Sequence, residues 1–560
     1  MENMDYDLRS VQEVRDLVRM GQIATEQIAN YNEEQIDRIL RNMVKVAEEN
    51  AVMLAKMAVE ETGFGKVEDK TYKNHMASTM TYNAIKDMKT IGIINEDPIA
   101  RTMDVADPVG LIMGIVPSTN PTSTAIFKAM VSIKSRNAIV FSPHPSAAKC
   151  TLKAAQLMCQ AAVEAGAPAN IIGCCSMPSM PATNELMHHK DIKLIIATGG
   201  PGMVKAAYSA GVPALGVGAG NSPAYIERTA NVPQAVANIM ASKTFDNGTI
   251  CASEQSVICE ECNKDAVVAE FKKHGAYFMS DEETAKVCKL LFKNGGHAMN
   301  AKFVGRAATV IASAAGITVP ADTKVLIGAQ GGVGDGYPLS YEKLTTVLAF
   351  YVVKDWHEAC ELSIDLLQNG IGHTMSLHTE DRNVVMEFTK KPASRILVNT
   401  GGTMGGTGAS TGLLPSFTLG CGTWGGSSIS ENLSPMHLVN VKKVAYGLKD
   451  CTRLAQDDPT FNHPELNTMA QGSGCTMTMS SCGRPVNVPD MSKAGCKTDN
   501  YLSPAEYQNG AQQNNSGISY SVGCGCGGSS EAPVASDQPI DVAQLTDMIN
   551  AMVKAMKGEE

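Results

Sequence analysis

Apolar and polar residues over positions 6–60 alternate with the period of an α-helix. Apolar residues recur three and four positions apart, with charged residues between them. A helix brings residues at this spacing onto one face, so the pattern predicts amphipathic helices with one buried side. The positions that carry the pattern are Val11, Val14, Leu17, Val18, Ile36, Ile39, Leu40, Met43, Val44 and Val46.

The pattern changes at about residue 109, where short apolar runs begin to alternate with Ala-rich stretches. Such runs predict buried strands, and the stretches between them predict helices. Strands that alternate with helices form βαβ units, so we expect an α/β fold with a parallel sheet. The runs are Val109–Val116, Ile139–Phe141 and Ile192–Ile196, and the stretches are Ser123–Lys134, Ala147–Ala165 and Met203–Ala210.

A second alternating region covers about residues 225–410. It contains predicted helices at Ala235–Lys243 and Asp265–Lys273 and a predicted strand at Val347–Val353. We find no repeat of fixed short period, which argues against a solenoid. Two such regions agree with a length of 560 residues, which exceeds one ordinary core and suits two or three domains.

Beyond about residue 450 the composition changes again. Residues 470–530 consist mostly of Gly, Ser, Asn, Gln, Thr, Met and Cys, so we interpret residues 451–538 as a flexible linker. Residues 539–560 regain a helical apolar stripe, with acidic Asp541 near its start and Lys554 and Lys557 near its end, as the helix dipole favours. The stripe consists of Val542, Leu545, Met548, Ile549, Met552, Val553 and Met556.

Charge and composition exclude several classes of protein. The chain has 47 Lys+Arg and 57 Asp+Glu, a net charge of −10, which argues against a general nucleic-acid binder. Sixteen cysteines in so long a chain fit a reducing cytosol better than a disulfide scaffold. The first residues lack the apolar core of a secretory signal, and no apolar run reaches the roughly 20 residues that span a bilayer. We expect a soluble cytoplasmic protein without nucleic-acid or membrane partners.

The most informative window for chemistry is Phe245-Asp-Asn-Gly-Thr-Ile-Cys-Ala-Ser-Glu-Gln255. Cys251 follows a Gly-containing turn after a predicted helix, where backbone N–H groups can lower the pKa of a thiol. A nucleophilic thiolate is one interpretation of this window. A buried core cysteine is the other, and the window by itself leaves both open.

Six motifs together resemble the aldehyde dehydrogenase superfamily, specifically its CoA-acylating acetaldehyde and propionaldehyde dehydrogenases and the matching half of bifunctional aldehyde–alcohol dehydrogenases. The resemblance runs in order from about residue 30 to 447. The motifs are Glu61-Thr-Gly-Phe-Gly-Lys66, Gly114-Ile-Val-Pro-Ser-Thr-Asn-Pro-Thr-Ser123, Ala197-Thr-Gly-Gly-Pro-Gly202, Gly216-Val-Gly-Ala-Gly-Asn-Ser-Pro223, Phe245–Gln255 and Phe417-Thr-Leu-Gly-Cys-Gly-Thr-Trp-Gly-Gly426.

This resemblance implies an α/β aldehyde dehydrogenase fold with a division into domains. We expect an NAD-binding domain over residues 1–224 and a catalytic domain over 225–410, followed by a return to the core over 411–450. Small oligomerisation strands are expected near residues 96–107 and 436–446. The implied assembly is a homo-oligomer, a dimer or a tetramer.

The resemblance also assigns the reacting groups. Cys251 matches the family nucleophile, which attacks the aldehyde and becomes a thioester after loss of hydride to the nicotinamide. Asn120 matches the side-chain donor of the oxyanion hole, with the backbone N–H of Cys251 as the second donor. The implied cofactor is NAD, with coenzyme A as co-substrate and a short aliphatic aldehyde, acetaldehyde or propionaldehyde, as substrate.

Val217 separates acyl transfer from hydrolysis. Hydrolytic relatives carry a Glu at this position, which activates the water that cleaves the thioester, and the neighbouring Gly216 and Gly218 offer no carboxylate either. Valine cannot abstract a proton, whereas CoA supplies its own sulfur nucleophile. We therefore expect acyl-CoA and NADH as products. An acylating enzyme for a polar or sulfonated aldehyde, or one that acts mainly in the reductive direction, remains the alternative.

The cofactor contacts are expected on three segments. A Gly-rich strand–helix turn brings dinucleotide phosphates close to backbone N–H groups. Glu342 matches the family residue that holds the nicotinamide ribose, and Ser142, in Ser142-Pro-His-Pro145, lies where many relatives carry Lys and Glu near the adenine ribose. Because of that departure, the preference for NAD or NADP stays open. The turn residues are Thr198, Gly199, Gly200 and Gly202.

Several other residues stay ambiguous. His373 either assists proton movement at the site or is a hydrogen-bonded structural residue, and we favour the structural role. Cys259 and Cys262 have metal-ligand spacing without a second pair, so we expect no metal site. The linker cysteines offer a metal or redox site only in principle; they are Cys475, Cys482, Cys496, Cys524 and Cys526.

The C-terminal helix resembles the short encapsulation helices that dock enzymes to bacterial microcompartment shells. We therefore expect residues 540–557 to bind a shell protein. A helix that folds back on its own domain, or one that self-associates, is the alternative. A bifunctional aldehyde–alcohol dehydrogenase is disfavoured because the residues after 450 leave no room for a second catalytic domain, and a non-catalytic scaffold is disfavoured by the intact set Cys251, Asn120 and Glu342.

Overall fold

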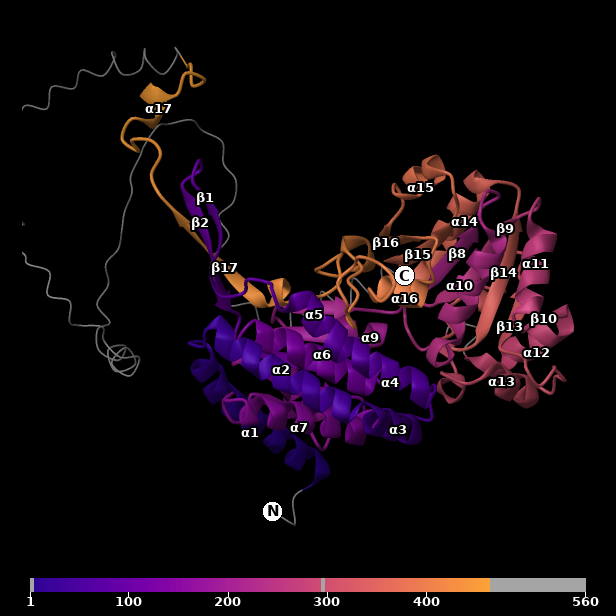
Figure 1. Cartoon of the computed structure of the whole chain (residues 1–560), viewed down its shortest axis with the longest axis horizontal. Helices are drawn as coiled ribbons and strands as arrows, with labels where there is room; N and C mark the ends of the chain where they lie inside the picture. Colours follow the sequence, from indigo (N-terminus) through magenta and orange to yellow (C-terminus); the bar gives the residue numbers. More distant parts are fainter. Residues whose placement is uncertain (1–4, 294–297, 464–560) are drawn as a thin grey trace, which may run out of the picture. The chain divides into compact units, whose positions relative to one another are not determined.

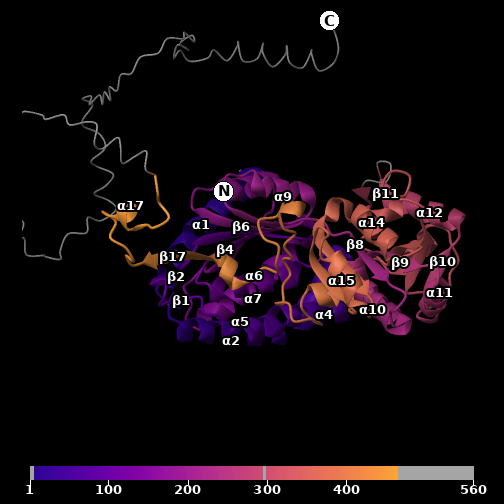
Figure 2. The same cartoon turned by 90° about the horizontal axis from the view of Figure 1, so that it is seen from above.

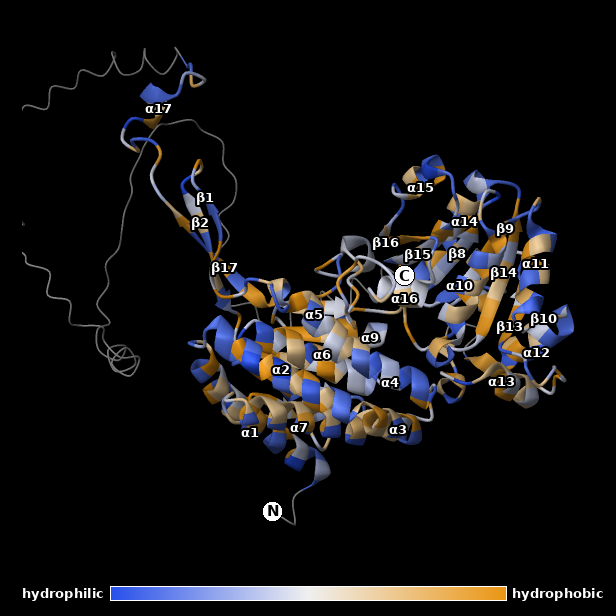
Figure 3. Ribbon diagram, viewed as in Figure 1, coloured by the Kyte–Doolittle hydropathy of each residue, from blue (hydrophilic) through white to orange (hydrophobic). Residues whose placement is uncertain are grey.

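The computed structural model describes residues 5–293 and 298–463. As predicted, its N-terminal part is helical, with α1 (Tyr6–Ile28), α2 (Glu33–Glu49), α3 (Ala51–Thr62), α4 (Val67–His75) and α5 (Thr81–Ile85). A capping box between Asn32 and Gln35 starts α2, and Gly63, at φ 68°, ends α3 in a left-handed conformation that glycine adopts freely. The buried residues of α2 are apolar, as predicted: Ile36, Ile39, Leu40, Met43 and Ala47. By contrast, α4 is mostly hydrophilic, blue in Figure 3, and its buried residues are Lys70, Lys73 and Asn74.

The first large sheet is parallel, with five strands in the order β5-β4-β3-β6-β7. The chain builds outward from β3 on one side and then from β6 on the other, so the carboxyl ends of these two strands border a crevice. Helix α6 (Pro121–Lys134) follows β3 and is buried along its whole length. The strands are β3 (Leu111–Val116), β4 (Ile139–Pro143), β5 (Ile172–Cys174), β6 (Ile192–Thr198) and β7 (Ala214–Val217), and the other helices are α7 (Ala148–Glu164), α8 (Met180–His188) and α9 (Pro201–Tyr208).

The second large sheet is also parallel, with seven strands in the order β10-β13-β14-β9-β8-β15-β16. Neighbouring residues of β9, Val257 and Ile258, belong to separate apolar clusters on the two faces, so the sheet is covered on both sides. Its strands are β8 (Ser222–Ile226), β9 (Glu254–Glu260), β10 (Ala276–Met279), β13 (Val325–Ala329), β14 (Val347–Val353), β15 (Gly372–His378) and β16 (Ala393–Val398).

The helices of this second part are α10 (Val232–Thr244), α11 (Lys264–Lys273), α12 (Asp281–Leu291), α13 (Ala308–Ala314), α14 (Trp356–Leu367), α15 (Arg382–Phe388) and α16 (Gly402–Gly406). Seen from above, the two sheets and their helices lie side by side (Figure 2). The chain leaves the first sheet after Val217 and enters the second at Ser222, slightly before the expected boundary at residue 224, because Ser222–Ile226 is already a buried strand.

A return segment carries the chain back to the first sheet. Phe417, Leu433 and Leu438 belong to the apolar core of the first sheet, and the Ser427 hydroxyl donates to the Gly216 carbonyl at 2.8 Å. The segment ends in β17 (Val439–Ala445), which lies antiparallel to β2 (Thr102–Pro108), with β1 (Gly92–Asp97) on the other side of β2. This three-stranded sheet extends away from the helices of the first part (Figure 1).

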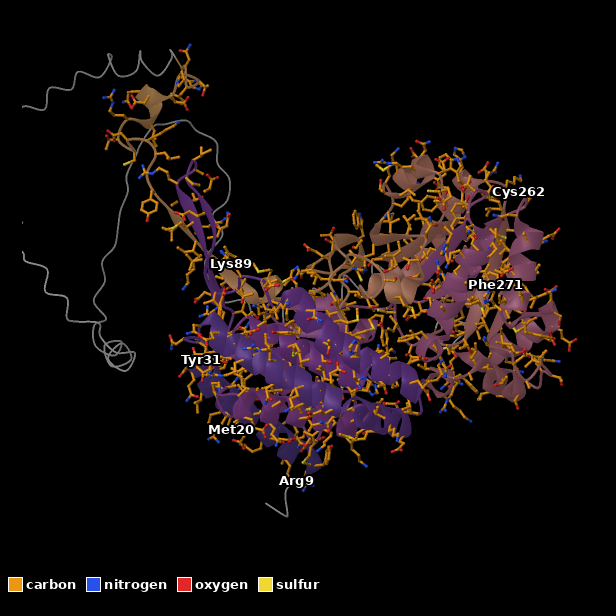
Figure 4. All side chains as sticks on the ribbon, viewed as in Figure 1. Arg9, Met20, Tyr31, Lys89, Cys262 and Phe271 are labelled. Atoms are coloured by element: carbon orange, nitrogen blue, oxygen red, sulfur yellow. The ribbon has the colours of Figure 1, made fainter. Side chains whose placement is uncertain are left out.

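The structure also bears on the expected absence of membrane-spanning helices and on the cysteine pair Cys259 and Cys262. Among the residues that the structure describes, no helix has both the length and the apolar character to cross a membrane. Cys259 is buried whereas Cys262 is exposed at the surface (Figure 4), and no cluster of three metal-ligating side chains occurs in the described part of the chain. The short helix α17 (Leu454–Asp457) is the last described helix and lies within the predicted linker, residues 451–538. The rest of that linker and the predicted C-terminal helix lie outside the described residues.

Candidate active site

A cavity of about 350 Å³ opens between the two large sheets, at the carboxyl ends of β3 and β6. It is lined at one end by His144 and Ser146, which follow β4, and at the other by Cys251. Its walls come from loops of both sheets and from the return segment, including Phe417 and Leu419. Residues that are distant in sequence therefore meet in one space.

Cys251 lies in the loop between α10 and β9. Three consecutive residues before it have positive φ, namely Asp246 (48°), Asn247 (53°) and Gly248 (74°), which makes a tight elbow. Apolar neighbours surround the thiol, so burial, and next the carboxylate of Glu342, raise the pKa of Cys251 to about 12. Desolvation therefore outweighs any lowering of the thiol pKa by the N–H groups of the turn.

His373, on β15, contacts the Cys251 thiol. Its Nε2 atom lies 3.1 Å from the Cys251 sulfur, and its Nδ1 atom lies 2.8 Å from the hydroxyl oxygen of Thr374. Burial and then the charge of Arg395 hold the pKa of His373 well below its usual value, so the ring is neutral at physiological pH. A neutral imidazole at this distance can accept the proton of the thiol, so the geometry is compatible with the catalytic alternative as well as with the structural role that we favoured.

Asn120 caps the N-terminus of α6 directly after β3 and lines the same cavity as Cys251. Its Oδ1 atom accepts a hydrogen bond from Lys73 Nζ at 2.6 Å. Its Nδ2 atom donates to the Thr119 hydroxyl at 3.2 Å and to the Thr249 carbonyl at 3.5 Å. The structure thus brings the amide and the nucleophile together although 130 residues separate them in sequence.

Most residues of the predicted glycine-rich turn line the cavity. Thr198 ends β6 and Pro201 begins α9, and both line the cavity together with Gly199 and Gly200. The N-terminal end of α9 therefore opens onto the cavity, an arrangement that favours phosphate groups. Gly202, which we also predicted, lies in the first turn of α9 and does not line the cavity.

Ser142 does not reach the cavity. It lies within β4, is buried, and its hydroxyl is 2.9 Å from that of Thr183. The next turn of the chain carries His144 and Ser146 into the cavity instead. The strand continues through Pro143 and keeps the Ser142 side chain inside the domain, so the contact of Ser142 with the cofactor stays a prediction that this position does not favour.

Glu342 lies on the cavity wall near Cys251. Its Oε1 atom accepts a hydrogen bond from the Gly220 backbone N–H at 2.9 Å. Burial raises the pKa of Glu342 to about 7, against the opposing effects of the Gly220 N–H and of Lys243 and Lys343. Glu342 thus lines the cavity, and its contact with the nicotinamide ribose stays a prediction.

Val217 ends β7, is 1% exposed, and forms part of the apolar wall beside Cys251. Among the described residues that line the cavity, Glu342 is the only carboxylate, and none is a lysine or arginine. The wall therefore provides no acidic group at the position where hydrolytic relatives have one.

Comparison with known proteins identifies the family. Residues 4–286 match the model of the aldehyde dehydrogenase family. The chain is 50% identical over 443 residues to the bifunctional aldehyde-alcohol dehydrogenase AdhE of Escherichia coli K12, covering 78% of this chain and 50% of that protein. It is 41% identical over 440 residues to the acetylating succinate-semialdehyde dehydrogenase of Clostridium kluyveri, covering 78% and 96% of the two chains.

Solved structures agree with these matches. An acetylating aldehyde dehydrogenase from Geobacillus thermoglucosidasius shares 53% identity and superposes with a TM-score of 0.78, covering 80% of this chain and 99% of the other. The protein therefore belongs to the aldehyde dehydrogenase family and has its α/β fold. The chain spans about half the length of several curated relatives that it matches, the aldehyde-alcohol dehydrogenases.

Proposed function

We propose that the protein is a CoA-acylating aldehyde dehydrogenase that converts an aldehyde, CoA and NAD reversibly into acyl-CoA and NADH. The observation that carries this proposal is the thiol of Cys251, in contact with a neutral His373 and facing Asn120, in a cavity where Val217 replaces a water-activating carboxylate. The arrangement forms a thioester and lacks the group that would hydrolyse it.

Each residue of the site has a separate role in the proposed reaction. His373 Nε2 accepts the proton of Cys251 as the sulfur attacks the aldehyde carbon, and the Asn120 amide and the Cys251 backbone N–H donate to the oxygen that becomes negative. When bound, a nicotinamide dinucleotide would serve as the hydride acceptor. Glu342 holds its ribose, and the turn at Thr198, Gly199 and Gly200 holds its phosphates. The thiol of CoA then attacks the thioester carbon and releases Cys251.

The cavity favours a small uncharged aldehyde, such as acetaldehyde or propionaldehyde. No lysine or arginine lines it among the described residues, so a carboxylate or sulfonate on the substrate would be desolvated without a partner. Arg395 is one cation near the cavity, but it donates to carbonyls of His373 at 3.0 Å and Gly420 at 2.6 Å and to the Thr374 hydroxyl at 3.2 Å, so its guanidinium is already bonded within the protein. Lys73 is another, and its ammonium is bonded to Asp246, Asn120 and Thr249.

NAD is favoured over NADP for a similar reason. The end of the cavity next to β4 is lined by His144 and Ser146 rather than by lysine or arginine. A 2′-phosphate at that end would lack a cationic partner, whereas a 2′-hydroxyl needs only hydrogen bonds. The ratio of kcat/KM for the two cofactors measures this preference directly.

One assay tests the reaction. Purified protein is mixed with NAD and a panel of aldehydes, with and without CoA, and NADH and acyl-CoA are measured. NADH should accumulate steadily only with CoA, fastest with acetaldehyde or propionaldehyde and at least about tenfold slower with succinate semialdehyde or sulfoacetaldehyde. Steady release of free acid without CoA would contradict the acyl-transfer proposal, and a preference for the charged aldehydes would contradict the substrate class.

We further propose that residues 540–557 dock the enzyme to a shell protein, so that it works inside a bacterial microcompartment in the cytoplasm. The amphipathic stripe of the sequence supports this, although these residues lie outside the described part. A solved structure with 27% identity and a TM-score of 0.72 is a propionaldehyde dehydrogenase from the fucose utilisation microcompartment of Clostridium phytofermentans. Fusion of residues 539–560 to a fluorescent protein should make it co-purify with shells, and a diffuse cytoplasmic signal would contradict the docking role.

A further inference from the structure

Helix α4 carries two buried lysines that meet in one place. Lys70 and Lys73 lie three residues apart, are 2% and 1% exposed, and both donate to Asp246 Oδ2, at 2.8 and 2.5 Å. Asp246 itself is fully buried, in the elbow that precedes Cys251. One ammonium group balances the charge of one carboxylate, so charge balance at Asp246 does not by itself explain why a second lysine is buried there.

Lys73 makes further contacts on both sides of the active site. Its Nζ atom donates to Asn120 Oδ1 at 2.6 Å, in the loop after β3 of the first sheet. The same atom donates to the Thr249 hydroxyl at 3.0 Å, in the loop before Cys251 that leads to the second sheet. A single buried ammonium thus connects the loop of the oxyanion donor to the loop of the nucleophile.

This contact also fixes which way the Asn120 amide faces. An ammonium group only donates, and a carboxamide accepts only through its oxygen, so Oδ1 must face Lys73. The NH₂ group then points away from Lys73, toward the Thr119 hydroxyl and the Thr249 carbonyl. Rotation of the amide by 180° would place NH₂ against the ammonium and remove the donor from the site.

The elbow is held by the same helix. Asp246 Oδ1 accepts from the Lys66 backbone N–H at 2.7 Å, and the Asp246 N–H donates to Asp69 Oδ2 at 2.7 Å. Left-handed φ angles at Asp246 and Asn247 cost free energy for residues other than glycine, and these bonds offset that cost. The N-terminal turns of α4 therefore set the position of the nucleophile loop.

We propose that Lys73 is a positioning residue that aligns the two halves of the oxyanion hole, the Asn120 amide and the Cys251 loop. The inference rests on the proposed function, since it assumes that Asn120 donates to the oxyanion. An ammonium that served only to neutralise Asp246 would have no need of Asn120 or Thr249. Lys70, which donates to the Thr119 carbonyl at 2.9 Å and not to Asn120, already neutralises that carboxylate.

A double-mutant cycle on the full-length chain tests the proposal, with CoA-dependent NADH formation as the assay. Asn120→Ala should lower kcat about 10²–10³-fold. Lys73→Met should lower kcat about tenfold to a hundredfold in the wild-type background, with KM for aldehyde and CoA changed by less than about threefold, but only about twofold in the Asn120→Ala background. Such non-additivity is expected only if Lys73 acts through Asn120.

Lys134→Met is the matched control. Lys134 is also buried and lies on α6, but it donates to the Lys86 carbonyl at 2.8 Å, away from the cavity. Its removal should leave kcat within about twofold in both backgrounds. If Lys73→Met does not fold, Lys73→Leu, which likewise removes the donor toward Asn120 Oδ1, is measured in both backgrounds by the same criterion.

The outcomes separate this inference from the proposed function. If Asn120→Ala keeps wild-type turnover, the oxyanion role of Asn120 fails, and this inference fails with it. If Asn120→Ala is impaired while the lysine variant loses the same factor in both backgrounds, the inference alone is overturned, because Lys73 then acts on stability or on Asp246 and not through the amide.

Discussion

The contact between Cys251 and His373 couples the reactivity of the thiol to a base that is neutral at physiological pH. The thiol has a raised pKa because it is desolvated, and the imidazole has a lowered pKa because it is desolvated beside Arg395. A stable thiolate–imidazolium pair is therefore disfavoured in the free enzyme. In the proposed reaction we therefore expect proton transfer to accompany attack on the aldehyde rather than to precede it.

Labelling of Cys251 by iodoacetamide tests this arrangement. With the pKa of the thiol raised to about 12, the labelling rate should keep rising with pH through pH 10 without a plateau at neutral pH. The rate is measured by mass spectrometry of the peptide that contains Cys251. A plateau below pH 8 would indicate a preformed thiolate and contradict the assignment.

His373→Asn removes the base while keeping a polar side chain. We expect kcat to fall about 10²–10⁴-fold, because general base catalysis contributes that much, with KM for CoA little changed. Thermal unfolding of the variant serves as the control for folding. Full activity would show that the contact between His373 and Cys251 is structural only.

Val217→Glu tests why the thioester is not hydrolysed. A carboxylate at this position should activate water and raise CoA-independent release of free acid about tenfold to a hundredfold above wild type. The same change buries a charge in an apolar wall, so the unfolding temperature should fall. Val217→Leu is the matched control, and acid release by both variants would contradict the argument.

At the scale of elements, strands and helices with strong periodicity were predictable from the sequence. The predicted strand Val347–Val353 is β14, and the predicted helix Asp265–Lys273 lies within α11. The orientation of single side chains was less predictable, because tertiary contacts determine it. Ser142, for example, faces the interior of the domain because β4 continues past it. The lysines of α4 gave no sign that this helix contacts the site. Lysine is usually a surface residue, so nothing in the sequence indicated that Lys70 and Lys73 are buried.

The homo-oligomer stays a prediction, and the three-stranded sheet offers a test of it. Val441 and Val444 on β17 are 44% and 37% exposed, although β17 pairs fully with β2 and is tied to it by the ion pair of Lys442 with Asp107 at 2.7 Å. Apolar side chains exposed on a projecting sheet favour contact with a second copy. Val441→Asp combined with Val444→Asp should convert a dimer or tetramer to smaller species, as measured by light scattering. An unchanged mass would contradict the assignment of this sheet as an oligomerisation element.

At the scale of the whole molecule, every residue assigned to the active site lies within residues 1–461, one of the two units into which the chain divides. A chain truncated after Phe461 should therefore keep CoA-dependent kcat within about twofold, because no reacting group is removed. The same truncation should abolish binding to a shell protein. Loss of turnover would show that the C-terminal segment contributes to catalysis rather than only to location.

The sequence by itself determined the order of elements, the division into two α/β regions and a distinct C-terminal segment, and the motifs around Cys251 and Asn120, because these depend on periodicity and local spacing. Only the tertiary structure decided which side chains meet. His373 reaches Cys251 across 122 residues and Lys73 reaches Asn120 across 47, because strand order and helix packing bring them together. It also decided the pKa of the thiol, since desolvation is a property of the packed site.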